Sequence, residues 1–232
     1  MHWAVVHSLF DLLAVAAGWI AGRLTAPLLP ARAGPRELAY FATLLASAVL
    51  GAYWFGTVNL VLSGQPGIGR SVFGAMIGGV VGIEIFKRVK GIRASTGARL
   101  VVPLAIVIGV GRIGCFFAGL EDFTYGTPSV LPWAVDFGDG VARHPVQLYE
   151  TALMFAFAAC FVQWLRRDPA AAAARGFYVF AGFYAIERFV LEFIKPYGTL
   201  AGTLTIFQLG ALLLIVYAAF MYRGVAHGPA KA

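Results

Sequence analysis

Residues 101–120 read VVPLAIVIGVGRIGCFFAGL, a stretch long enough to cross a lipid bilayer and interrupted by one charged residue, Arg112. A transmembrane helix needs about 20 predominantly apolar residues. The rest of the 232-residue chain is similar, since 60% of its residues are hydrophobic and only 12% are charged. A soluble domain normally carries about 25% charged residues. This composition predicts an integral membrane protein.

Apolar segments of this kind recur along the chain, separated by short polar loops. They predict seven transmembrane helices, at residues 2–22, 38–62, 71–86, 98–118, 145–165, 176–194 and 203–221. Residues 1–232 are expected to form one all-α transmembrane domain with no soluble extension and no cleavable signal. The longest loop, 119–144, alternates like a short strand between Pro132 and Phe137 and then reads GDG, which predicts a short β-hairpin.

The positive charges predict how the helices are oriented. Lys and Arg are concentrated in the first, third and fifth loops and in the C-terminal tail, whereas the alternate loops hold only Arg70, Arg143 and Lys195. Cytoplasmic loops carry the excess of Lys and Arg, so the N-terminus is expected outside and the C-terminus in the cytoplasm. The net charge of +7 is then a consequence of topology. Because these residues lie beside anionic membrane lipids, a nucleic-acid partner is not expected.

Several polar residues fall inside the apolar segments at one expected depth, within the outer leaflet. They come from four predicted helices and comprise His7, Asp11, Arg112, Gln147, Glu150, Arg188 and Glu192. An Arg or Asp at the centre of a membrane helix costs about 2.5–3.5 kcal/mol on insertion scales. These side chains are therefore expected to face the interior of the bundle.

Two inward arginines at headgroup depth favour an anionic ligand, most simply a lipid phosphate. The guanidinium group stays charged and offers a planar fork of donors that matches phosphate oxygens. The alternative is a purely structural role, in which pairs such as Arg188–Glu192 hold the bundle together. The sequence thus predicts a site for a phospholipid headgroup and leaves the structural alternative open.

The cysteines and glycines have simpler interpretations. Cys115 and Cys160 are expected to be small packing residues, with no disulfide and no metal-ligand spacing, and no metal or cofactor is predicted. Gly74, Gly78 and Gly82 recur every four residues, which predicts a close approach of another helix.

Three segments resemble those of the prolipoprotein diacylglyceryl transferase family. They are GRIGCF at 111–116, HPVQLYE at 144–150 and FYAIERFVLEFIKP at 183–196. The resemblance implies transfer of a diacylglyceryl group from phosphatidylglycerol to the cysteine thiol of a prolipoprotein lipobox. It also implies a multi-pass protein of the bacterial inner membrane that works at the outer face.

The resemblance also implies roles for individual residues. Arg112 and Arg188 would hold the phosphate and stabilise charge on the leaving group. Tyr184 and Glu192 would orient Arg188, and Glu121 corresponds to an acidic residue of the family's arginine motif. The headgroup-binding residues expected on this basis are Arg112, Arg188, Glu192, Tyr184, Gln147, Glu150 and Glu121.

Two departures from the family pattern bear on the chemistry. Phe73 stands where the family has a histidine, and Cys115 where it has an asparagine. The thiolate is the nucleophilic form of cysteine, so the acceptor's proton must go elsewhere. We expect His7, oriented by Asp11, to take it, with His144 as second choice. Two alternatives stay open: a paralogous transferase with the same donor and another acceptor, and a non-catalytic phospholipid-binding or transport protein.

Overall fold

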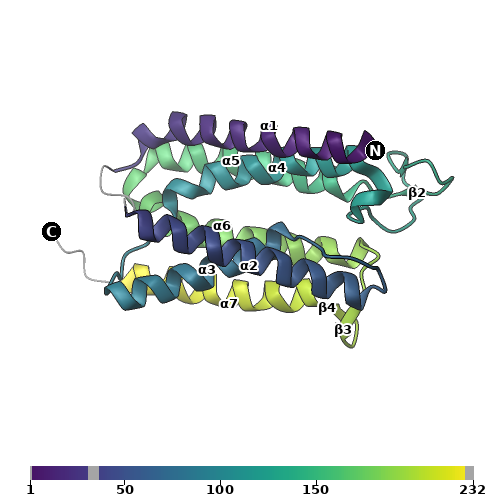
Figure 1. Cartoon of the computed structure of the whole chain (residues 1–232). Coiled ribbons are helices and arrows are strands. Elements are labelled where there is room, and N and C mark those ends of the chain that lie inside the picture. The colour runs from purple at the N-terminus through teal and green to yellow at the C-terminus, as the bar shows by residue number, and fades with distance from the viewer. Residues whose placement is uncertain (1, 31–36, 228–232) are drawn as a thin grey trace. The chain divides into compact units, whose positions relative to one another are not determined.

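The computed structural model describes residues 2–30 and 37–227, in which helices dominate (Figure 1). The α-helices are α1 (His2–Thr25), α2 (Leu38–Leu62), α3 (Val72–Lys90), α4 (Val101–Ala118), α5 (Val146–Arg167), α6 (Pro169–Leu191) and α7 (Ile206–His227). Short 3-10 helices are η1 (Ala26–Leu28), η2 (Ala98–Leu100), η3 (Gly119–Asp122) and η4 (Glu192–Ile194). Two antiparallel strand pairs are β1 (Val135–Asp136) with β2 (Ala142–Arg143) and β3 (Thr199–Ala201) with β4 (Leu204–Thr205).

Five helical segments of the described chain are long and apolar enough to cross a membrane. They are Val5–Leu28, Leu38–Leu62, Ala98–Asp122, Val146–Arg167 and Ile206–Val225. Helices α3 and α6 do not meet both conditions. Helix α3 is apolar but carries Glu84, Lys87 and Arg88 near its end, and α6 is less apolar because it contains Arg175, Glu187 and Arg188. The prediction of a helical membrane protein is confirmed, and crossing by all seven helices stays a prediction.

The chain divides into two compact units. Unit 1 comprises Met1–Ala31, Gly97–Phe177 and Phe193–Pro196, and unit 2 comprises Arg32–Thr96, Tyr178–Glu192 and Tyr197–Ala232. In unit 1, α4 lies beside α1 and packs against α5 (Figure 1). A side chain added at Gly18 or Gly114 of these helices would overlap Val107 or Phe10, so the glycines allow α1 and α4 to approach closely.

In unit 2, glycines likewise allow α2 and α3 to approach closely. A Cβ atom at Gly74 or Gly78 would overlap the backbone of Gly51 or Ser47 on α2, and one at Gly82 would overlap the Ser47 side chain. Small residues let helix backbones approach where lipid supplies no hydrophobic driving force between helices. The close packing predicted from the Gly74, Gly78 and Gly82 spacing is confirmed.

The expected hairpin in loop 119–144 is present. Val135 pairs with Arg143 and Asp136 with Ala142 in antiparallel register. In the turn, the Asp136 carboxylate accepts hydrogen bonds from the backbone N–H groups of Gly138, Asp139 and Gly140. Arg143 donates two hydrogen bonds of 2.7 Å to Asp139, and this contact holds the pKa of the exposed Asp139 carboxyl below its ordinary value.

Two elements differ from the sequence-based expectation. Helix α6 begins at Pro169 and not near residue 176, because the Asp168 carboxylate caps it by accepting from the N–H of Ala171 and the following alanines are strong helix formers. The strand pair Thr199–Thr205 was not predicted. Its turn is made by Gly202, whose φ of 58° lies in the left-handed region.

Candidate functional site

In unit 1, one buried carboxylate joins two buried cations. Glu150, in the second turn of α5, places Oε2 2.7 Å from the Nε of Arg112 on α4 and Oε1 2.8 Å from the Nζ of Lys195. Arg112 is 7% exposed, Glu150 1% and Lys195 5%. Arg112 and Glu150, which were expected at a similar depth, are therefore in direct contact. Lys195 was expected in an outer loop, and the structure instead places it in this buried group.

Gln147 lies one turn before Glu150 on the same helix and is fully buried. Within residues 2–30 and 37–227, neither its side-chain nitrogen nor its side-chain oxygen has a hydrogen-bond partner. The next turn is fixed to α4, because the Thr151 hydroxyl donates to the backbone oxygens of Gly109 and Gln147. A buried amide without partners costs about 1–3 kcal/mol, so Gln147 is suited to receive a polar ligand.

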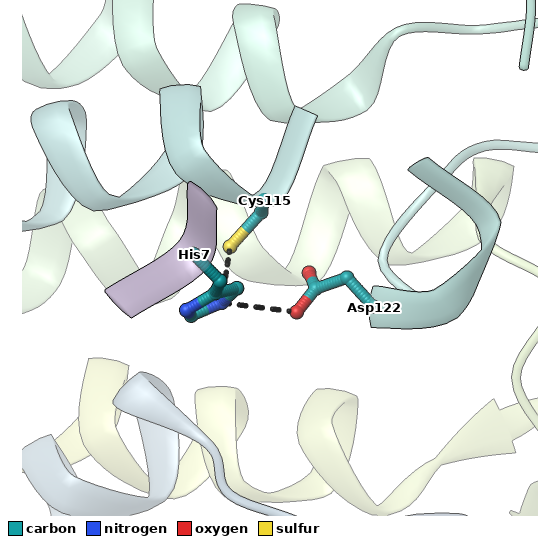
Figure 2. A group of neighbouring side chains, drawn as sticks. All are labelled: His7, Cys115 and Asp122. Carbon is teal, nitrogen blue, oxygen red and sulfur yellow. Dashed lines mark hydrogen bonds and ion pairs between the residues drawn. The ribbon is translucent and has the colours of Figure 1, made fainter. Parts of the chain in front are cut away.

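A second group in unit 1 combines three chemically different side chains (Figure 2). His7 of α1 lies with its Nε2 3.2 Å from Oδ1 of Asp122 and 3.8 Å from Sγ of Cys115. Cys115 is on the last turn of α4, which packs against α1, and Asp122 ends η3, just after the break in the helix at Gly119. We call these residues the His7 cluster. Its three side-chain donor atoms lie within 4.8 Å of one another.

Each member of the His7 cluster has a further polar neighbour. Nδ1 of His7 lies 3.1 Å from Oδ2 of Asp11, as the one-turn spacing predicted. The Thr124 hydroxyl donates to Oδ2 of Asp122 over 2.6 Å. Nη1 of Arg112 lies 3.9 Å from Sγ of Cys115, so the cluster adjoins the Arg112–Glu150–Lys195 group.

In unit 2, Arg188 is held by a separate polar network. Its Nε lies 3.2 Å from Oε2 of Glu192, and the Thr205 hydroxyl donates to the other Glu192 oxygen over 2.9 Å. The guanidinium carbon lies 4.2 Å from the centre of the Phe207 ring, a cation–π contact. Arg188 and Glu192 are each 2% exposed. The predicted pair is present, and a charge this deeply enclosed has little freedom to reorient.

Tyr184 and Phe73 belong to an aromatic cluster in the same unit. Tyr184 stacks on Phe180, and its ring centre lies 5.7 Å from that of Phe73. Phe73 is completely buried and also contacts the rings of Phe55 and Phe207 edge-on. At the position where the family resemblance implies a histidine, the phenyl ring of Phe73 therefore packs in the aromatic cluster, and no imidazole is present to accept a proton.

The other predicted residues lie in or beside the outer loop. Nδ1 of His144 is 3.4 Å from the Tyr149 hydroxyl, and the His144 backbone bonds to Gly126 and Thr127. Glu121 is exposed, whereas its neighbour Asp122 belongs to the His7 cluster. Sequence reasoning missed Asp122, because this residue lies beyond the helix break at Gly119, where helical spacing no longer predicts which side chains are neighbours. It also missed Thr205, for which the sequence carries no signal.

The comparisons with known proteins agree on one family. A family model for prolipoprotein diacylglyceryl transferase matches residues 3–223. The chain is 29% identical to the phosphatidylglycerol–prolipoprotein diacylglyceryl transferase of Bordetella avium, over 94% of this chain and 90% of the relative. It is 32% identical to the Clostridium tetani enzyme of that name and 36% identical to the Methylococcus capsulatus one. Those two alignments cover 68% and 64% of this chain, and only 64% and 58% of the relatives. No solved structure shows significant similarity.

Proposed function

Because the chain belongs to the prolipoprotein diacylglyceryl transferase family, we propose that it moves a diacylglyceryl group from phosphatidylglycerol to a prolipoprotein cysteine thiol. The sulfur attacks the glycerol carbon next to the phosphate, the carbon–oxygen bond breaks, and glycerol phosphate leaves. This reaction needs an anion site for the phosphate, a route for the thiol proton, and access for a lipid.

The anion site is proposed at Arg112, Lys195 and Gln147. The observation that carries this assignment is the Glu150 carboxylate, which fixes Arg112 and Lys195 side by side within the bundle. Cations held in advance near a developing negative charge are among the largest contributors to catalysis. The buried Gln147 amide supplies neutral donors one turn away.

Arg188 is proposed to stabilise negative charge on the phosphate and the leaving group, as the family resemblance implies. Its support is the Glu192–Thr205 network, which fixes the guanidinium on the Phe207 ring. Tyr184 lies one turn earlier on α6 and is proposed to help orient it. Whether Arg112 and Arg188 hold one headgroup together stays a prediction, as do the headgroup role of Glu121 and the second-choice base His144.

The thiol proton is proposed to leave at the His7 cluster, because Phe73, at the position where the family resemblance implies a histidine, carries no titratable group. The Asp11 carboxylate orients the His7 ring, as expected for a residue that handles a proton. Changing His7 to Gln should abolish transfer, and full activity of that variant would refute the role.

The membrane arrangement is part of the same proposal. We place the protein in the bacterial inner membrane with seven crossings, the N-terminus outside and the C-terminus in the cytoplasm. The positive-inside distribution of Lys and Arg supports this orientation. The phospholipid would then enter sideways from the outer leaflet and the lipobox peptide from the outer face.

The test is to reconstitute the purified protein with labelled phosphatidylglycerol, with and without a lipobox peptide. Glycerol phosphate released only with the peptide supports the proposal. Release with other nucleophiles would indicate a paralogous transferase with another acceptor. Binding of the lipid with no release under any condition would indicate a phospholipid-binding or transport protein, and would overturn the transferase assignment.

A further inference from the structure

We propose that His7, Cys115 and Asp122 bind one Zn²⁺ ion and leave its fourth position open for the thiol of the acceptor. The identity of the fourth ligand rests on the proposed function, whereas metal binding by this cluster does not. The sequence-based interpretation gave Cys115 a packing role only, because His7 lies far away along the chain and Asp122 lies beyond the end of the helix that carries Cys115.

The donor atoms and their spacing suit zinc. Imidazole nitrogen, thiolate sulfur and carboxylate oxygen are its three usual protein ligands, and catalytic sites use three of them with one open position. With Zn–N and Zn–O bonds of about 2.0–2.2 Å and Zn–S of about 2.3 Å, tetrahedral geometry separates N from O by about 3.3 Å and S from N by about 3.6 Å. The cluster has 3.2 Å between His7 Nε2 and Asp122 Oδ1 and 3.8 Å between His7 Nε2 and Cys115 Sγ.

Two of the three prospective ligands, His7 and Asp122, are also oriented by a contact on the side away from the proposed metal. Metal-binding histidines usually donate their second N–H to a carboxylate, and Nδ1 of His7 faces Asp11 at 3.1 Å. Thr124 holds the Asp122 oxygen that faces away from His7, which leaves Oδ1 to bind a metal through one oxygen. These contacts fix the ring and carboxylate orientations that a metal site needs.

The arrangement of charges favours a bound cation. Both nitrogens of one imidazole face carboxylate oxygens, and the Cys115 sulfur lies against the same ring. A metal among Nε2, Sγ and Oδ1 neutralises the thiolate and carboxylate and keeps Nδ1–H as the donor to Asp11. The side chains of His7 and Asp122 are 20% and 16% exposed while Cys115 is buried, so an ion and a fourth ligand would reach the cluster from the His7–Asp122 side.

A zinc ion at this position explains how the acceptor thiol becomes nucleophilic. With zinc bound, His7 is a metal ligand and no longer the base. Coordination of R–SH to Zn²⁺ would release the proton to water and leave a bound thiolate. That sulfur forms the new bond to the glycerol carbon of phosphatidylglycerol, and the carbon–oxygen bond to phosphate breaks. The departing phosphate oxygen keeps the electron pair, so no oxidant or reductant is needed, and the thioether product is a weaker ligand that can dissociate.

The position of Arg112 supports this use of the metal. Its Nη1 lies 3.9 Å from Cys115 Sγ, so a phosphate bound by Arg112 and a thiolate bound by the zinc would be neighbours. Holding two reactants next to each other in the correct orientation removes much of the entropic part of a barrier.

Metal binding is tested on the full-length protein in detergent, stripped with a chelator and titrated with Co²⁺ as a spectroscopic substitute for Zn²⁺. We expect one equivalent per chain, the charge-transfer absorption of a cobalt–thiolate bond and displacement by Zn²⁺. Cys115→Ser should lose the thiolate absorption, and Cys160→Ser, at the exposed cysteine, should keep it. Asp11→Asn should weaken binding about 10–100-fold. Wild-type protein without the absorption, or Cys115→Ser protein that retains it, would overturn the proposal.

A second measurement covers the case in which Cys115→Ser does not fold. In the Cys160→Ser protein, Zn²⁺ should protect Cys115 from alkylation by a maleimide, and an unchanged alkylation rate would count against the site. The role in transfer is then read separately by adding Zn²⁺ to stripped enzyme with lipid and lipobox peptide. Metal binding without any transfer would contradict the proposed function only, and full transfer in stripped enzyme would contradict thiol activation by the metal.

Discussion

Arg112 and Cys115 lie one turn apart on α4, with the guanidinium Nη1 3.9 Å from the cysteine sulfur. Glu150 holds the same arginine from α5, and His7 faces the same sulfur from α1. Arg112, which is assigned to the donor phosphate, and the cluster assigned to the acceptor thiol therefore adjoin within one unit of the protein. This proximity makes a direct transfer between two bound substrates the simplest chemistry for the site.

Gln147→Leu should stabilise the protein and weaken lipid binding at the same time. The buried amide has no partner within the described residues, so an apolar side chain of similar volume removes a cost of about 1–3 kcal/mol. The measurements are the free energy of unfolding in detergent and the affinity for phosphatidylglycerol. A variant that is less stable than the wild type, or one that binds the lipid equally well, would contradict the assignment of Gln147 to the headgroup.

Glu150→Gln should be more damaging than Lys195→Gln. The first change removes the carboxylate that Arg112 and Lys195 share, and loss of one partner from a buried ion pair costs about 3–5 kcal/mol. The second leaves Glu150 paired with Arg112, so the loss is that of one charge-assisted hydrogen bond, about 1.5–3 kcal/mol. The free energy of unfolding, measured for both variants, shows which change costs more stability. Equal losses of stability would mean that Glu150 is not the bridging group.

Gly78→Ala should destabilise the contact between α2 and α3. The added methyl group would overlap the backbone oxygen of Ser47, and overpacking of this kind costs about 1–3 kcal/mol. Gly224→Ala on α7 is the matched control, because its Cβ meets open space and alanine is the better helix former by up to about 1 kcal/mol. If both variants unfold at the same temperature, the close glycine contact does not contribute to stability.

Phe73→His should not restore a catalytic base. The side chain is fully buried among aromatic rings, so an imidazole there would be poorly hydrogen-bonded and should cost about 1–3 kcal/mol of stability. Phe73→Leu, which changes the packing without adding a polar group, is the control. A rise in the transfer rate of Phe73→His would place thiol activation on α3 and away from the His7 cluster.

The sequence predicted most helices well, because length and hydrophobicity decide where a chain crosses lipid. Helix α2 matches the expected residues 38–62, while α6 begins earlier than expected because the interpretation of 169–175 as a loop underestimated an aspartate cap and an alanine run. The strand pair Thr199–Thr205 is too short for an alternating pattern to be distinguished from a loop.

The candidate site was predictable where helical spacing and depth determine the neighbours. Pairs such as His7–Asp11 and Arg188–Glu192 are one turn apart, and Arg112 was expected at the level of Glu150. Lys195 and Asp122 were missed for a different reason. Each sits just beyond the end of an α-helix, where a 3-10 turn redirects the chain, and local sequence does not fix the direction that a side chain then takes.

The central claim is tested most directly by mass spectrometry of a lipobox peptide incubated with the reconstituted protein and phosphatidylglycerol. Wild-type protein should add one diacylglyceryl group to the peptide cysteine as a thioether, and Arg112→Gln protein of the same fold should add almost none. An unmodified peptide with the wild type, or equal modification by Arg112→Gln, would contradict the account.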